Sequence, residues 1–175
     1  MKIGFLLILI AFPIVGFRMA KKVEFKQNVT GYLKRAADAN TIDLANQELT
    51  KALDYLEAND LTSGYTSVLY ETPDEDIDFW YRNLKASQAE LQNLQSESTL
   101  EKTNLLIKLR ETLLDTGEKT RVTVPDGMAV YPHNKFWAGM MIFALLALFA
   151  GFSLIAVESD RIEKEKQAKL AKQQE

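Results

Sequence analysis

The sequence contains no cysteine and only one histidine, His133, among its 175 residues. Without cysteine the chain forms no disulfide, holds no thiolate-ligated metal and has no cysteine nucleophile. A single histidine also removes most zinc sites and most Ser-His-Asp triads. The sequence carries no phosphate-binding glycine loop, no nucleophile elbow and no HExxH motif. We therefore expect a protein that is not an enzyme and that binds no cofactor and no metal.

The chain also lacks an excess of basic charge. It has 21 Lys and Arg residues against 24 Asp and Glu residues, for a net charge of −3. Domains that bind nucleic acid are usually strongly basic, so we expect no nucleic-acid partner. The length is that of one domain of ordinary size.

What the sequence does contain is a stretch of 22 residues without a charge, from Phe136 to Val157. As an α-helix this stretch would measure about 33 Å, close to the ~30 Å hydrocarbon core of a bilayer. Lys135 and Trp137 lie at one end and Glu158 follows the other, as is typical of membrane interfaces. The sequence therefore predicts a transmembrane helix over residues 136–157.

A second apolar stretch, of 15 residues, runs from Ile3 to Phe17 and is flanked by Lys2 and Arg18. Its length also suits the core of a cleaved signal peptide, which is the alternative interpretation. Against cleavage, the strict small-x-small pattern is missing, and basic side chains can snorkel to lengthen the effective span. We expect an uncleaved transmembrane anchor over residues 1–20.

Orientation is harder to predict, because most Lys and Arg residues lie between the two spans. The positive-inside rule holds for loops shorter than about 60 residues, and this loop is longer. A short N-terminus with a single lysine, Lys2, is typical of export signals. We expect two passes through a membrane, most consistent with a bacterial inner membrane, with both termini inside and the middle domain outside the cytoplasm.

Between the spans, apolar residues recur in steps of three and four, which places each set on one face of a helix. The sets are Phe25, Val29, Tyr32, Leu33 and Ala36; Ile42, Ala45, Leu49, Leu53 and Leu56; Ile77, Trp80, Leu84, Leu91 and Leu94; and Leu106, Leu109 and Leu113. They predict three or four antiparallel helices over residues 21–118.

Local signals predict where these helices begin and end. Asn40 or Thr41 is expected to cap a helix that ends near Ala58. A further helix restarts near Ser98 and is expected to end at Gly117, because glycine commonly follows the last helical turn.

The segment Thr72-Pro73-Asp74-Glu75 is a strong start signal, with Thr72 as N-cap and Glu75 completing a capping box. Five acidic side chains gather here and would suit calcium, although the spacing of an EF-hand loop is missing. Acids are also favoured at helix N-termini by the helix dipole, so we interpret them as structural. They are Glu71, Asp74, Glu75, Asp76 and Asp78.

Residues 119–135 change character. Val122 and Val124 alternate with polar residues, and the turn-forming residues 125–127 precede Met128–Tyr131. We expect a hairpin or an extended collar before the second span. Residues 158–175 have strong helix formers of alternating charge, which predicts a charged helical tail.

Five aromatic residues lie close together in the middle domain. Trp80 shares the apolar stripe of its helix, whereas Phe79 is rotated from it by about 100°. Core packing is one interpretation of the group, and a partner surface is the other, because Tyr and Trp are enriched in interfaces. The candidate surface residues are Phe79, Tyr81, Tyr65 and Tyr70. His133, between Pro132 and Asn134, is interpreted as a solvated loop residue rather than a proton switch.

In the second span, Ala144, Ala147 and Gly151 recur in steps of three and four. Small residues let membrane helices approach closely, so this face is a candidate for packing against the first span or another subunit.

Together these patterns predict an all-α membrane protein in which two transmembrane helices frame a small helical bundle. The expected function is a non-enzymatic interaction or scaffold protein. Its partners would be the bilayer and another membrane or extramembrane protein, or a second copy of the chain. The alternative is a small-ligand sensor that signals through the second span to a separate protein.

Overall fold

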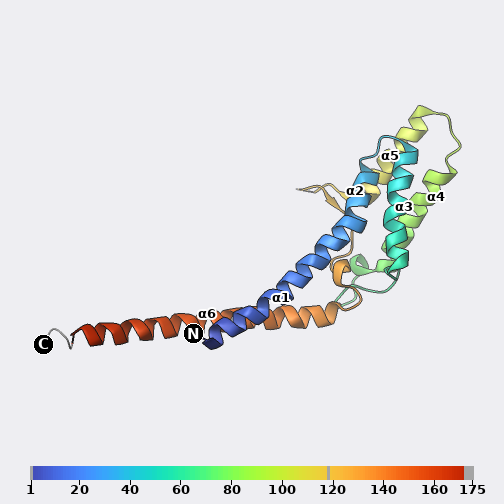
Figure 1. The fold of residues 1–175 in the computed structure, drawn as a ribbon. Helices are drawn as coiled ribbons and strands as arrows, with labels where there is room; N and C mark the ends of the chain where they lie inside the picture. The colour runs from blue at the N-terminus through green and yellow to red at the C-terminus, as the bar shows by residue number, and fades with distance from the viewer. Residues whose placement is uncertain (1, 118, 172–175) are drawn as a thin grey trace. The chain divides into compact units, whose positions relative to one another are not determined.

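The computed structural model describes residues 2–117 and 119–171, and it is mostly helical, which confirms the predicted all-α class. The helices are α1 (Lys2–Phe25), α2 (Gly31–Ala37), α3 (Ile42–Ala58), α4 (Ile77–Asn93), α5 (Thr99–Leu113) and α6 (Asn134–Ala171) (Figure 1). A π-helical segment, η1 (Lys26–Thr30), joins α1 to α2, and short 3-10 turns cover η2 (Pro73–Glu75) and η3 (Met128–Val130). Met1, Glu118 and residues 172–175 of the predicted tail lie outside the described residues.

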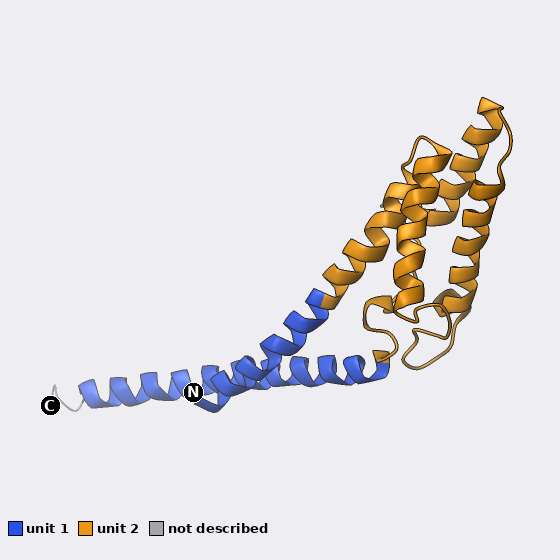
Figure 2. Cartoon of the chain, turned by 45° about the vertical axis from the view of Figure 1, so that its right-hand side comes forward, with its two compact units in different colours: residues 1–20, 135–175 blue, residues 21–134 orange. Residues whose placement is uncertain are grey.

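The chain divides into two compact units, which Figure 2 distinguishes by colour. Unit 1 comprises residues 1–20 and 135–175, and unit 2 comprises residues 21–134. Each unit has its own cluster of buried apolar side chains.

Unit 2 is a bundle of α2, α3, α4 and α5, in which α3 packs against α2 and α4, and α5 packs against the same two helices (Figure 1). Its core consists of the apolar stripes seen in the sequence, because steps of three and four bring those residues to one face. The largest fully buried apolar side chains are Leu33, Leu49, Leu53, Leu56, Ile77, Leu84, Leu113 and Val29.

One charged group is buried within this bundle. Glu48 on α3 is only 1% exposed, and its carboxylate lies 2.9 Å from Nε of Arg35 and 2.7 Å from Nζ of Lys51. A buried carboxylate is costly unless it is paired, so the two cations stabilise its position between α2 and α3.

The predicted start of α3 is confirmed, because the Thr41 side chain accepts a hydrogen bond from the Leu44 backbone at 3.3 Å. The predicted start of α4 is wrong. Thr72 precedes only the turn η2, and its hydroxyl donates to Glu75 at 2.8 Å instead of capping the backbone. The cap of α4 is Asp76, which accepts from the Phe79 backbone at 3.1 Å.

Backbone pairing with an earlier segment explains this shift. Tyr65 and Asp76 form an antiparallel bridge, and the Ile77 N–H donates to the Gly64 carbonyl at 2.9 Å. This pairing holds Asp76 in an extended conformation, so the turn at Pro73 cannot run on into α4.

The hairpin is also placed differently from the prediction. Its strands are β1 (Leu114–Asp115) and β2 (Arg121–Val122), whereas Met128–Val130, expected in an extended segment, forms η3. The helix expected to reach Gly117 stops at Leu113. Leu113 and Leu114 are both buried. At Leu114 the chain leaves the helix and pairs with Val122 of β2.

In unit 1 the first part of α1 and α6 run antiparallel. Gly4 lies against Gly151, Ala11 clusters with Ala144 and Ala147, and the rings of Phe17 and Trp137 stack at 5.0 Å. Two helices, Lys2–Ala37 and Asn134–Leu170, are long and apolar enough to cross a membrane. The charged segment after Val157 continues α6 to Ala171, as expected.

Candidate functional site

The four candidate aromatic side chains come from two segments of unit 2, α4 and the connection between α3 and α4. Phe79 and Tyr81 leave α4 on opposite sides, because two residues along a helix turn through about 200°. Tyr65 and Tyr70 belong to the connection between α3 and α4 and are 41% and 77% exposed. Trp80 is 7% exposed and donates its indole N–H to the Thr123 carbonyl at 2.8 Å, so its place is in the core.

Phe79 is 58% exposed and lies on the rim of a groove of about 430 Å³. The groove, which we call the acidic groove, lies between the start of α4 and the β1–β2 hairpin. Apolar side chains line part of it, including Trp80, Leu84, Val122 and Val124. Its charged lining residues are Asp74, Glu75, Asp76, Asp115, Asp126 and Arg121.

The five carboxylates that line the acidic groove outnumber its one guanidinium, Arg121, so the groove favours cationic groups. Three of the carboxylates already accept hydrogen bonds from within the chain: Glu75 from Thr72, Asp76 from the Phe79 backbone, and Asp115 from the Gly117 backbone. Asp74 and Asp126, both exposed, come from two different segments and border the groove together.

Tyr81 has an intramolecular partner. Its hydroxyl donates to Glu57 of α3 at 2.6 Å, and Lys85 donates to the same carboxylate oxygen at 3.3 Å. Burial, followed by this hydrogen bond, raises the pKa of Tyr81 to about 12. The Tyr81 hydroxyl and Lys85 lower the pKa of Glu57. The Tyr81 hydroxyl therefore links α4 to α3 and is not free to bind a partner.

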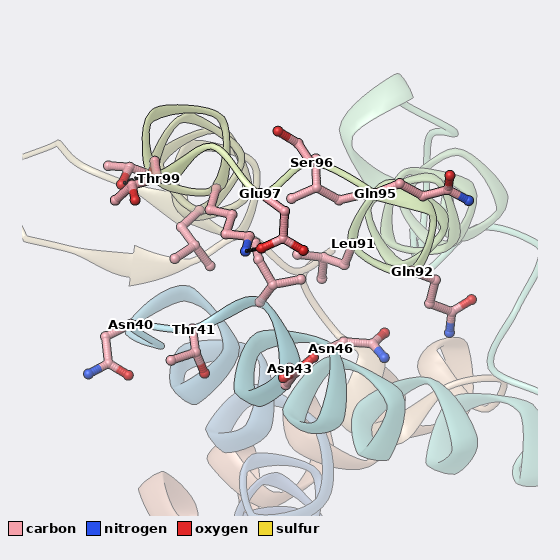
Figure 3. A pocket seen from close by; sticks show the side chains of 15 residues that line it. Asn40, Thr41, Asp43, Asn46, Leu91, Gln92, Gln95, Ser96, Glu97 and Thr99 are labelled. Atoms are coloured by element: carbon pink, nitrogen blue, oxygen red, sulfur yellow. Dashed lines mark hydrogen bonds and ion pairs between the residues drawn. The ribbon is translucent and has the colours of Figure 1, made fainter.

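A second pocket, of about 680 Å³, lies where the starts of α3 and α5 meet the α4–α5 connection (Figure 3). Uncharged polar side chains dominate its lining, and the amide oxygen of Asn46 is buried there without a hydrogen-bond partner. Lys102 and Glu97 lie 3.7 Å apart at its edge. Its lining residues include Asn40, Thr41, Asp43, Asn46, Gln92, Gln95, Ser96, Thr99 and Thr103.

The sequence did not reveal this pocket, because its polar residues come from three separate segments and follow no motif. The only signal was the pair of helix starts at Thr41 and Ser98, which the bundle places at the same end.

Three of the five clustered acidic residues have partners within the chain: Glu75 accepts from Thr72, Asp76 caps α4, and Asp78 pairs with Arg82 at 3.0 Å. Within residues 2–117 and 119–171, no group of three or more His, Asp or Glu side chains is placed to hold a metal ion. His133 is exposed, and its backbone N–H donates to the Val130 carbonyl at 2.9 Å.

The small residues of α6 lie at the crossing with α1. Ala144 is fully buried and Ala147 is 5% exposed, and both cluster with Ala11. A Cβ added at Gly151 would lie 2.9 Å from the Gly4 carbonyl oxygen and 2.8 Å from Cγ1 of Ile8. Only glycine allows the two backbones to approach this closely.

Comparisons of the chain with protein-family models, with curated proteins and with solved structures find no match. The function proposed below therefore depends on the residues and geometry of this chain alone.

Proposed function

We propose that this chain is a two-pass membrane protein without enzymatic activity, whose unit 2 lies outside the cytoplasm and binds a protein partner at the acidic groove. The observation that carries the membrane part is the reversed burial of unit 1. Large apolar side chains point outward, with Leu9 68%, Phe12 66% and Phe149 76% exposed, while alanines and glycines form the contact.

This arrangement is unfavourable in water. Apolar surface costs about 25 cal/mol per Å² when it is exposed to water, and the two helices expose it on most faces. In a bilayer the same side chains meet acyl chains, and small residues drive helix association through close packing.

The partner surface is supported by one exposed aromatic side chain beside a charged groove. The exposed Phe79 ring does not belong to the core of unit 2, and exposed aromatic side chains often anchor interfaces. The carboxylates around it suit a partner segment that carries Lys or Arg next to an apolar side chain.

Cysteine labelling tests the membrane topology, because the chain contains no cysteine of its own. Ser87→Cys in α4 should react with an impermeant maleimide on intact cells, and Gln167→Cys in α6 should react only after permeabilisation. Equal labelling at both positions would contradict the two-pass topology, and labelling of Gln167→Cys alone would reverse the orientation.

Photo-cross-linking tests the partner surface. A benzophenone amino acid at position 79 should form an adduct in membranes that weakens with salt and with Asp74→Lys or Asp126→Lys. The matched control is the same probe at Leu100, an exposed apolar position on α5 that is 68% exposed. If the yield of the adduct at position 79 changes neither with salt nor with the lysine substitutions, the acidic groove is not the binding site.

A sensor function is the second candidate, and the polar pocket of Figure 3 favours it. The amide oxygen of Asn46 has no hydrogen-bond partner and is buried, so the side chain would have to turn toward the pocket to accept a hydrogen bond from a small polar ligand. A panel of amino acids and sugars should then raise the melting temperature of the wild-type chain but not of Asn46→Leu. If no member of the panel does so, the pocket gives no support to a sensor.

A further inference from the structure

The connection between α3 and α4 carries three consecutive apolar side chains that the fold leaves in solvent. Val68 is 40% exposed, Leu69 is 83% exposed and Tyr70 is 77% exposed. We call Val68–Tyr70 the apolar tip. Exposed leucine and tyrosine next to each other gain nothing from the bundle core, which makes them candidates for a contact outside unit 2.

The segments on both sides of the apolar tip are held in place. Thr66 is 2% exposed, and its N–H donates to the Glu75 carbonyl at 3.1 Å. On the other side, Glu75 donates to the Thr72 carbonyl at 3.0 Å. The tip is therefore a short excursion from a fixed base, and ordering it on a surface costs little conformational entropy.

That base lies against the end of unit 2. The Tyr131 hydroxyl donates to the Ser63 carbonyl at 2.9 Å, and Tyr131 leaves no room for a Cβ at Gly64. Thr66 lies beside Gly127, whose carbonyl accepts from the Asn134 side chain at 3.1 Å. The loop that bears the tip is thus attached to residues 127–134, immediately before the second apolar span.

Covalent distance then limits how far the tip can lie from the start of the second apolar span. Phe136 begins the span and is two residues beyond Asn134. Leu69 is three residues beyond Thr66, which is at most about 11 Å of extended chain. The headgroup region on each side of the hydrocarbon core is about 5–8 Å thick. The path from Phe136 through Asn134, Gly127 and Thr66 to Leu69 therefore permits the tip to reach that region.

We propose that the apolar tip inserts its Leu69 and Tyr70 side chains into the headgroup region of the bilayer. This inference depends on the proposed membrane crossing of α6. Tyrosine favours this region because its ring is apolar and its hydroxyl remains hydrated. The tip is followed by Glu71 and the acids of η2, so the surface it fits is a neutral, zwitterionic one.

The test uses the full chain in phosphatidylcholine nanodiscs, with single cysteines that carry an environment-sensitive fluorophore. Leu69→Cys reports on the tip, Leu100→Cys is a matched exposed leucine of unit 2, and Leu146→Cys lies in the middle of the apolar stretch of α6. Lipids brominated at a shallow or a deep acyl position serve as quenchers.

We expect the shallow quencher to act more strongly than the deep one at Leu69→Cys, and the reverse at Leu146→Cys. Neither should quench Leu100→Cys. If Leu146→Cys is quenched and Leu69→Cys behaves like Leu100→Cys, the tip does not touch lipid and this inference is wrong. If Leu146→Cys is not quenched, the membrane crossing itself fails.

A protein occupant would give a different result. The fluorophore at Leu69→Cys would then be shielded from an aqueous quencher in native membranes but open to it in nanodiscs that contain only the chain. That outcome would also overturn the inference. As a second variant, Leu69→Ser with Tyr70→Ser should retain the melting temperature, because neither side chain contributes to the core.

Discussion

The two units bury their side chains in opposite ways. In unit 2, leucines such as Leu49 and Leu53 are buried, and charged residues cover the surface. In unit 1, the buried residues are small ones, Gly4, Ala11, Ala144, Ala147 and Gly151, whereas most of the leucines and phenylalanines point outward. Unit 2 has the pattern of a domain stabilised by removing apolar surface from water. Unit 1 has the reverse pattern, which the proposed membrane crossing would explain.

The difference also concerns how close the backbones come. In unit 2 large side chains separate the helices and fill the space between them. In unit 1 the Gly4 and Gly151 backbones nearly touch, and the two helices associate through the close packing of small residues. Substitutions of the same chemical kind should therefore have opposite effects in the two units.

The largest expected effect is the loss of a large core side chain from unit 2. Trp80→Ala removes a buried ring and its hydrogen bond to Thr123, so it should lower the free energy of unfolding by about 3–5 kcal/mol. Phe79→Ala, at the neighbouring exposed position, should change it by less than about 0.5 kcal/mol. Thermal unfolding of the full chain in mild detergent, followed by circular dichroism, measures both. Equal losses would mean that both rings belong to the core.

In unit 1 the damaging change is to add a side chain instead of removing one. Gly151→Ile should push α6 away from Gly4 and Ile8 of α1, at a cost of about 1–3 kcal/mol. The matched control is Gly139→Ile, because a Cβ at Gly139 meets no atom within 4 Å. The readout is a disulfide between cysteines placed at Ala11 and Ala144, which should form in membranes, persist with Gly139→Ile and weaken with Gly151→Ile. A cross-link that Gly151→Ile leaves intact would argue against this crossing.

The sequence predicted most of the helices because apolar periodicity reports directly on burial. The stripe containing Ile77, Trp80 and Leu84 corresponds to the core face of α4. Where prediction failed, a distant contact decided the outcome. Thr72 looked like a helix cap, but the pairing of Asp76 with Tyr65 moved the cap by four residues.

The same reason accounts for the hairpin and for the sites. The strand partner of Val122 is Leu114, which local turn chemistry around Gly127 did not suggest. The acidic groove joins Asp74 to Asp126, and no spacing rule connects residues so far apart. Exposure of Phe79 was predictable from helical geometry, but its position beside those acids was not.

A smaller effect is expected at the start of α4, which belongs wholly to unit 2. Asp76→Ala removes the side chain that accepts from the Phe79 backbone, and losing an N-cap costs about 1 kcal/mol. Thr72→Ala should cost clearly less, because the Thr72 side chain makes no hydrogen bond to a backbone N–H. Chemical denaturation of the full chain compares the two variants. A larger loss for Thr72→Ala would restore the capping box that the sequence suggested.

The smallest expected effect is a dependence on alkaline pH, which also separates the units because all six tyrosines lie in unit 2. The pKa of Tyr81 is raised from 10.0 to about 12 by burial and by Glu57. Between these values the unfolded chain releases the Tyr81 proton and the folded chain retains it. The stabilising contribution of Tyr81 is therefore complete below pH 10 and is lost as the pH rises towards 12.

Tyr81→Phe should flatten this part of the stability profile, measured by denaturation at stepped pH. Glu57→Gln should flatten it only partly, because burial is the larger cause of the shift. If Glu57→Gln removes as much of the slope as Tyr81→Phe, the carboxylate and not burial sets the pKa of Tyr81.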